Sequence, residues 1–310
     1  MYKFKKDAVV GFLGDSITAR TKWTCRILDY YREINPDCTM KIFNAGRSGG
    51  VAPVAVRRMV TDLIPYNPTD VVIMFGMNDI KHELWNCENV TEELLKERAK
   101  ALEEYEKALT TIADTLSEKG VNLIFCTPTP TNLNMITENP YKAGSIVGLQ
   151  KASRIVKKLA ENYGGHVVDF NTEFFDVMET LQEEDLYNTI VDTDRVHPSM
   201  EGQEVMAKLF LKAQGFDVPV YSTMAEWKAE AEKPLSEHTQ PVYDVTMRLR
   251  ALAFIEWGMV RDVPQDEIEA KLEAIYNGED ANDFVRSRID MYREDFPKKH
   301  QLIEELIRIQ

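Results

Sequence analysis

The sequence predicts an α/β protein with a flavodoxin-like three-layer α/β/α fold, a five-stranded parallel sheet and an all-helical C-terminal appendage. Short apolar runs alternate with longer segments of helical periodicity through the first two-thirds of the chain, which is the pattern of βαβ units. The run at 70–75 is apolar almost throughout, as a central strand covered on both faces should be. Beyond residue 217 no strand pattern remains.

Five strands are expected, each a short run of apolar, β-branched and aromatic residues. They span residues 8–13, 40–43, 70–75, 121–126 and 166–170. The clearest helix spans 91–118, where apolar residues recur at helical spacing and Gly120 follows as a stop signal. Further helices are expected at 144–163 and 202–212.

The C-terminal part reads as helix throughout. Helices are expected at 223–232, 242–260, 265–276, 284–295 and 299–309, with prolines or glycine between them. An apolar stripe between Leu249 and Trp257 must be buried somewhere, so this part is expected to pack on the α/β domain or to mediate a homo-oligomer. The chain therefore divides into a domain at 1–216 and a helical appendage at 217–310.

The amino-acid composition limits the classes of partner that the protein is expected to bind. The formal net charge is −14 and the pI is about 5.0, which disfavours nucleic acid and anionic membranes as partners. No stretch is long enough to span a membrane. The short apolar run after the basic start leads directly into the motif at 14–17, so no signal peptide is expected and the location is expected to be cytoplasmic.

The four cysteines, at positions 25, 38, 87 and 126, form no C-x-x-C pair, and no H-E-x-x-H spacing occurs. Neither a structural zinc site nor a catalytic metal is indicated. No cofactor is expected.

A serine stands where the first strand ends. Gly14-Asp15-Ser16-Ile17 directly follows the apolar run at 8–13, and in open α/β sheets chemistry collects at the carboxyl ends of strands. A serine hydroxyl is a weak nucleophile until a base takes its proton. Ser16 alone is compatible with an ordinary turn or helix cap.

The best candidate for that base is His197. Asp194 lies three residues before it, a spacing that lets the carboxylate reach the imidazole across one tight turn. Asp192 is a rival carboxylate with a less natural spacing. The order Ser, Asp, His is one in which the catalytic triad occurs on unrelated folds.

Two further strand ends supply oxyanion donors. Gly46 follows the second strand and can present a backbone N–H at close range, while Asn78 follows the third strand and can offer its side-chain amide. The backbone N–H of Ser16 is a third donor. Singly these residues are typical of turns, but together, in this order, they favour acyl-transfer chemistry.

Together these motifs resemble the four blocks of the SGNH/GDSL hydrolase family of esterases, lipases and acylhydrolases. The blocks are Gly14-Asp15-Ser16, the Gly46 loop, Gly76-x-Asn78-Asp79 and Asp194-x-x-His197. They occur in family order between about residues 8 and 215. The resemblance implies the three-layer fold and metal-independent ester hydrolysis. It assigns Ser16 as nucleophile, Gly46 and Asn78 as oxyanion donors, and Asp194 and His197 as the rest of the triad, but it leaves the helical appendage unexplained.

Other residues beside these loops are candidates for the substrate pocket. They are Asp15, Arg20, Arg47, Asp79 and Trp85, together with the loop at 127–141. Asp15 is also expected to hold its own loop by hydrogen bonds. The pair His82-Glu83 could face the pocket, although a solvated loop pair is the simpler interpretation.

The leading hypothesis is therefore a serine esterase that forms an acyl-enzyme on Ser16 and hydrolyses short-acyl esters, such as acetyl esters of carbohydrates or other small molecules. A lysophospholipase or lipase and a thioesterase are alternatives within the same chemistry. A non-catalytic flavodoxin-like binding module is the more distant alternative. A phosphate-binding nucleotide enzyme is disfavoured, because an acid, Asp15, stands where a phosphate loop needs glycine and lysine.

Overall fold

A computed structural model describes residues 2–87, 89–132, 145–260 and 299–310, together with residues 267, 270, 271 and 274. The chain forms two compact units, Met1–Ser236 and Glu237–Gln310. None of the described helices is both long enough and apolar enough to cross a membrane.

The first unit is built on the predicted five-stranded parallel sheet. Its strand order is β2-β1-β3-β4-β5, and every neighbouring pair is parallel. The strands are β1 (Val9–Gly14), β2 (Lys41–Gly46), β3 (Asp70–Met74), β4 (Asn122–Cys126) and β5 (His166–Val168). The order reverses between β1 and β3, which is the switch point where α/β sheets place their sites. The flavodoxin-like fold class is confirmed.

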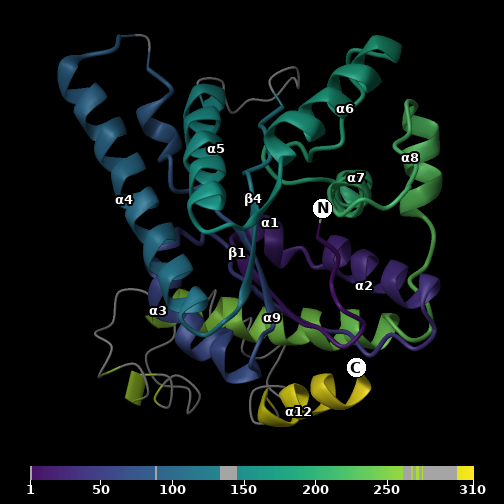
Figure 1. Ribbon diagram of the computed structural model, residues 1–310. Helices are drawn as coiled ribbons and strands as arrows, with labels where there is room; N and C mark the ends of the chain where they lie inside the picture. Colours follow the sequence, from purple (N-terminus) through teal and green to yellow (C-terminus); the bar gives the residue numbers. More distant parts are fainter. Residues whose placement is uncertain are drawn as a thin grey trace. The chain divides into compact units, whose positions relative to one another are not determined.

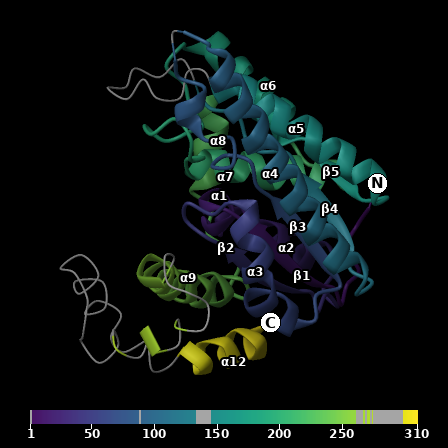
Figure 2. The same ribbon diagram turned by 90° about the vertical axis from the view of Figure 1, so that its left-hand side faces the viewer.

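Helices cover both faces of this sheet. Figure 1 shows α4 and α5 on one side of it and α2 and α7 on the other, and Figure 2 looks onto the face covered by α3, α4 and α5. The helices of this unit are α1 (Ser16–Ala19), α2 (Lys22–Ile34), α3 (Ala52–Asp62), η1 (Ile64–Tyr66), η2 (His82–Leu84), α4 (Glu92–Ser117), α5 (Ser145–Asn162), α6 (Phe170–Glu184), α7 (Met200–Ala213) and α8 (Met224–Ala231).

Polar residues cap these helices as elementary helix chemistry requires. Thr91 accepts a hydrogen bond from the N–H of Leu94 and so starts α4. Ser199 accepts from the N–H of Gly202 and starts α7 directly after the predicted histidine block. Thr223 and Glu226 form a capping box on α8.

Four of the described α-helices have no counterpart among the expected ones: the single turn α1 and the longer helices α2, α3 and α6. The strand expected at 166–170 ends early, because Asp169 caps α6 and Phe170 is the first residue of that helix. Phe170 is fully buried there. An aromatic residue at a strand end and one at a helix start look alike in sequence, so periodicity over three residues could not separate them.

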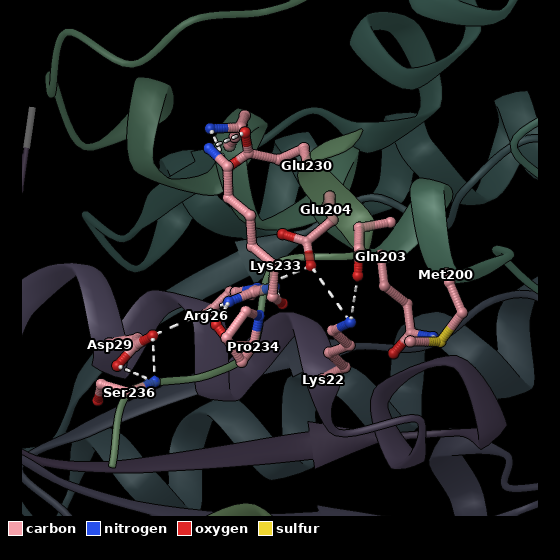
Figure 3. A network of polar contacts seen from close by, with 12 residues as sticks. Lys22, Arg26, Asp29, Met200, Gln203, Glu204, Glu230, Lys233, Pro234 and Ser236 are labelled. Atoms are coloured by element: carbon pink, nitrogen blue, oxygen red, sulfur yellow. Dashed lines mark hydrogen bonds and ion pairs between the residues drawn. The ribbon is translucent and has the colours of Figure 1, made fainter. Parts of the chain in front are cut away.

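The segment after α7 belongs to the first unit by its contacts, beyond the boundary expected at 216. Figure 3 shows the polar network that holds it on α2 and α7. Arg26 forms an ion pair with Glu204, its Nε lying 2.7 Å from Oε1, and its Nη1 donates to the carbonyl of Pro234 at 2.9 Å. Lys22 donates to the carbonyl of Ala231 at 2.8 Å. Glu204 is 2% exposed, so these basic groups are what make its burial tolerable.

The second unit contains α9 (Gln240–Val260) and α12 (Lys299–Ile309), which pack against each other. Both coincide closely with predicted helices, as does α8. The helices expected at 265–276 and 284–295 fall mostly outside the described residues. The expectation that the appendage packs on the α/β domain or mediates a homo-oligomer stays a prediction, as does the division into a hydrolase domain at 1–216 and a helical appendage at 217–310.

Candidate active site

Ser16 is the first residue of α1, immediately after β1. Asp15 caps this short helix by accepting a hydrogen bond from the N–H of Ile17 at 2.9 Å. The helix lies directly against the end of β2, since a Cβ added to Gly46 would sit 2.4 Å from the Ala19 nitrogen. Only glycine at 46 permits that approach. The nucleophile candidate is thus held at the switch point of the sheet.

His197 reaches Ser16 from the loop before α7. Its Nε2 lies 2.7 Å from the Ser16 Oγ, and its Nδ1 contacts the Asp194 Oδ2. These three side chains come from two segments 178 residues or more apart in the sequence. The arrangement has the contacts of a Ser-His-Asp triad, with a base beside the hydroxyl and a carboxylate behind the base.

The loop around Asp194 holds its carboxylate in the ionised form. Oδ1 accepts hydrogen bonds from the backbone N–H groups of Val196 and His197, both at 2.9 Å. Burial alone would raise the pKa of Asp194, but these hydrogen bonds and the His197 ring outweigh it and lower the pKa to about 2. The carboxylate is therefore charged wherever a histidine base could act.

The rival carboxylate has another partner. Asp192 Oδ2 lies 2.6 Å from Arg20 Nη2, and the backbone N–H of Asp192 donates to the carbonyl of His197 at 2.7 Å. Arg195, between Asp194 and His197, has a φ of 66°. That left-handed residue lies in the tight turn that brings Asp194 to the imidazole.

The glycine-rich loop after β2 lies beside Asn78. The Asn78 Nδ2 donates to the carbonyl of Gly50 at 3.0 Å, which leaves one amide hydrogen for another acceptor. The N–H of Gly46, by contrast, donates to the Asn44 Oδ1 at 2.9 Å. The structure thus gives the predicted oxyanion donor Gly46 a partner within its own strand.

Gly49 was missed in the sequence. Gly50 donates to the carbonyl of Arg47 at 3.0 Å and closes a turn in which Gly49 has a φ of 68°. The space where its Cβ would lie is empty to 4 Å, and among the described residues its N–H has no hydrogen-bond partner. The Ser48-Gly49-Gly50 run is a turn signal that indicates this conformation, but it does not show which N–H groups of the loop are already bonded.

Two buried carboxyl groups brace the loops. Asp79, 5% exposed, accepts from the N–H of Ala52 at 2.7 Å and from the N–H of Gly76 at 2.9 Å. Burial raises the pKa of Asp79 to about 6 against these hydrogen bonds. Burial likewise raises the pKa of Asp15 to about 7, with the Ile17 N–H opposing the shift and the charge of Asp79 adding to it. Both groups are therefore placed to support backbone.

Other pocket candidates have structural partners. Arg47 pairs with Asp62, its Nη2 lying 2.9 Å from Oδ2. Trp85 is 6% exposed and donates from Nε1 to the carbonyl of Ile80 at 2.8 Å. His82 lies with its Nδ1 2.6 Å from the buried Ser145 Oγ. Their roles in a pocket stay predictions.

The loop predicted to shape the pocket, 127–141, is described only to residue 132. Asn132 donates from its backbone N–H to the carbonyl of Arg195 at 3.1 Å. The start of this loop therefore contacts the histidine loop. Among the described residues, no group of three or more His, Cys, Asp or Glu side chains is placed to hold a metal ion.

Comparison with known proteins decides the family. Residues 12–205, more than half of the chain, match the GDSL-like Lipase/Acylhydrolase family. The chain belongs to this family. It is a carboxylic ester hydrolase of the GDSL type, as the motifs led us to expect, and the matched region contains Ser16, Asn78, Asp194 and His197.

Among relatives, the acetylxylan esterase of Geobacillus stearothermophilus is 28% identical over 221 residues, which cover 66% of this chain and 93% of that protein. One of its solved structures aligns with a TM-score of 0.55 at 25% identity, covering 71% of this chain and all of that one. A gut microbial diltiazem-metabolizing enzyme covers 100% of this chain and 96% of its own, with a TM-score of 0.78 and 18% identity. That likeness shows the fold alone.

Proposed function

We propose that this GDSL hydrolase is a serine esterase in which Ser16 is the nucleophile, His197 the general base and Asp194 the orienting carboxylate. The observation that carries the proposal is the 2.7 Å approach of His197 Nε2 to Ser16 Oγ, with Asp194 on the other ring nitrogen. Solved structures of the Geobacillus relative are described as catalytic mutants in which a serine, a histidine and an aspartate are each replaced. In that relative the aspartate precedes the histidine by three residues, as Asp194 precedes His197.

The proposed reaction has two halves. Ser16 Oγ attacks the ester carbonyl carbon while His197 Nε2 takes its proton, and the alcohol then leaves with that proton. A water molecule next attacks the acyl group on Ser16 and gives its proton to Nε2. Nε2 then returns that proton to Ser16 Oγ as the bond between Oγ and the acyl carbon breaks and the acid leaves. Asp194 holds the ring so that Nε2 faces the serine, and it stabilises the positive charge on the ring in both halves.

The negative oxygen that forms in each half needs N–H donors. We assign this role to the backbone N–H of Ser16, to the free amide hydrogen of Asn78 and to the glycine loop. Within that loop the N–H of Gly49 is the better donor, because Gly46 already donates to Asn44. Gly46 serves by letting α1 approach the sheet.

For the substrate we propose short-acyl esters, acetyl esters of carbohydrates foremost. The support is the Geobacillus relative, which is named an acetylxylan esterase. Lysophospholipase, lipase and thioesterase activities are the alternatives with the same nucleophile. The cytoplasmic location expected from the sequence stays a prediction.

A panel of esters tests this proposal. The purified protein is assayed with p-nitrophenyl acetate, butyrate and octanoate, with an acetyl thioester and with acetylated xylo-oligosaccharides. We expect the highest kcat/KM for acetyl oxygen esters and a loss of about 10⁴–10⁶ in kcat for Ser16→Ala. Ser117→Ala, a change at an exposed serine that ends α4, is the matched control. A preference for octanoate would indicate a lipase, and unchanged turnover in Ser16→Ala would refute the nucleophile.

A further inference from the structure

A second contact joins the two segments that carry the proposed nucleophile and base. Besides the approach of His197 to Ser16, the guanidinium of Arg20 pairs with Asp192 at 2.6 Å. Arg20 ends the helix that Ser16 begins, and Asp192 lies on the loop that carries His197. The sequence suggested Arg20 as a pocket residue and Asp192 as a rival triad carboxylate. In the structure the two side chains pair with each other, and the pocket role of Arg20 stays a prediction.

Backbone hydrogen bonds cross-link the loop at 190–199. The N–H of Asp192 donates to the carbonyl of His197 at 2.7 Å, and the N–H of Arg195 donates to the carbonyl of Asp192 at 2.9 Å. The N–H of Ser199 closes the base of the loop on the carbonyl of Ile190 at 2.9 Å. The backbone of Asp192 is thus hydrogen-bonded to the backbone of His197, so a displacement of Asp192 is expected to displace His197 as well.

Arg20 is equally rigidly joined to the nucleophile. Its N–H donates to the carbonyl of Ile17 at 3.2 Å, within the single turn that begins at Ser16. The next residue, Thr21, is fully buried with a φ of 61°, a strained conformation for a β-branched residue. Hydrogen bonds maintain it, including one from Thr21 Oγ1 to the carbonyl of Ala19 at 2.9 Å. These hydrogen bonds within the chain fix the backbone conformation beside Arg20.

The ion pair between Arg20 and Asp192 is partly exposed and is expected to contribute little to the free energy of folding. The Arg20 and Asp192 side chains are 28% and 38% exposed, and pairs of that kind contribute about 0–1 kcal/mol to folding. The effect of such a pair on the reaction rate can be much larger than its effect on folding, because a shift of about 1 Å between reacting groups can cost roughly a hundredfold in rate. A pair that adds little to folding can therefore matter greatly for the Ser16–His197 distance.

We propose that Arg20 and Asp192 are positioning residues whose ion pair holds the histidine loop against α1 and so sets the distance between Ser16 and His197. The inference rests on the proposed function, in which those two side chains react. Neither residue touches the reacting atoms. Arg20 acts through α1, and Asp192 acts through its backbone bond to His197.

The test compares Arg20→Ala, Asp192→Ala, the double variant and Arg20→Lys with the wild type. Two quantities are measured: kcat and KM for p-nitrophenyl acetate, and the rate at which a small alkyl fluorophosphonate labels Ser16. The labelling rate needs the base beside the nucleophile but no alcohol-binding pocket. Lys158→Ala is the matched control, since Lys158 forms an ion pair with Glu106 between α5 and α4, its Nζ 2.9 Å from Oε1. Thermal unfolding reports whether each variant is folded.

We expect each alanine variant to lower kcat and the labelling rate about 10- to 100-fold with KM nearly unchanged. The double variant should lose no more than the single ones, because one interaction is removed in all three. Arg20→Lys should recover part of the loss, and Lys158→Ala should match the wild type.

Three results would overturn the proposal. A rise in KM with unchanged kcat and labelling would make the pair a substrate contact. Unchanged kinetics in folded variants would make it an ordinary surface pair, and additive losses in the double variant would make the two residues independent. If the wild type hydrolyses esters but is not labelled at Ser16, the proposed function itself fails, and the two failures are thereby distinguished.

Discussion

Replacing Asp194 with asparagine separates its role in catalysis from its role in folding. Oδ1 accepts two backbone N–H groups and Oδ2 faces the His197 ring. An asparagine must turn its NH₂ group toward one of these sides, either toward the ring nitrogen or toward two donors. With the amide oxygen on the two backbone donors, the NH₂ group faces the ring and the imidazole loses the acceptor that fixes its tautomer. The opposite orientation leaves both backbone N–H groups without an acceptor, so the first is favoured, and we expect kcat to fall about 10⁴-fold, the size of such losses in serine hydrolases with a triad.

Asp194→Asn should change the free energy of unfolding much less than it changes the activation free energy of the reaction. Lowering the pKa of Asp194 from 3.8 to about 2 corresponds to about 2.5 kcal/mol at 1.36 kcal/mol per pKa unit. The side chain is 42% exposed, so solvent screening reduces this to about 1 kcal/mol. Since the folded pKa lies below the unfolded one, this stabilisation is present above pH 3.8 and is lost as the pH falls toward 2.

The assay pairs esterase kinetics with urea unfolding of the wild type and Asp194→Asn at pH 7 and at pH 3. The stability difference should shrink at the lower pH, while the activity loss at pH 7 stays near 10⁴-fold. Asp192→Asn is the matched control and should lose far less activity, because Asp192 faces Arg20. If Asp194→Asn kept kcat within tenfold of the wild type, or if Asp192→Asn lost more, the assignment of the triad carboxylate would be refuted.

Three further predictions concern an oxyanion donor, the buried carboxyl of Asp15 and the polar network of Figure 3. Asn78→Ala should lower kcat about 10²–10³-fold with KM nearly constant, as for loss of one oxyanion donor; a change in KM alone would make it a binding residue. Asp15 has a folded pKa of about 7, above its unfolded value, so its contribution to stability is full below pH 3.8 and is lost as the pH rises toward 7. Thermal unfolding of wild type and Asp15→Asn should therefore diverge in favour of the variant between pH 4 and pH 8, and a constant difference would count against the buried, neutral carboxyl. A chain ended after residue 219 should melt lower than one ended after residue 236, because the first loses the carbonyls that accept from Arg26; equal melting temperatures would show that the Figure 3 network contributes little.

The sheet and the site residues on it were predictable because local chemistry determines them. Apolar runs of five or six residues ended by glycine and polar residues indicate strands, and parallel strands bring their carboxyl ends to one edge. Ser16 and Asn78 are therefore expected at one edge of the sheet from the sequence alone, whereas the histidine loop follows the helix α6 and is predicted beside them only by the triad spacing and the family resemblance. The site roles themselves stay predictions.

The features of the site that could not be predicted depend on backbone conformation and on partners far away in the sequence. Asp192 and Asp194 look nearly equivalent in sequence, and only their partners in the folded chain distinguish them, Arg20 for Asp192 and His197 for Asp194. The partner of Arg20 is 172 positions away, and nothing in one sequence specifies such a pairing. Gly46 and Gly49 differ in which N–H is already bonded, a property that composition does not reveal.

The most direct test of the central claim is to locate the reactive serine. The protein is treated with an alkyl fluorophosphonate, whose phosphorus is attacked by an activated serine oxygen as fluoride leaves, and the adduct is located by peptide mass spectrometry. The account predicts one adduct per chain, on Ser16, formed in parallel with loss of esterase activity and absent from Ser16→Ala. An adduct on another residue that accompanies the loss of activity, or full esterase activity in an unlabelled Ser16→Ala protein, would contradict it.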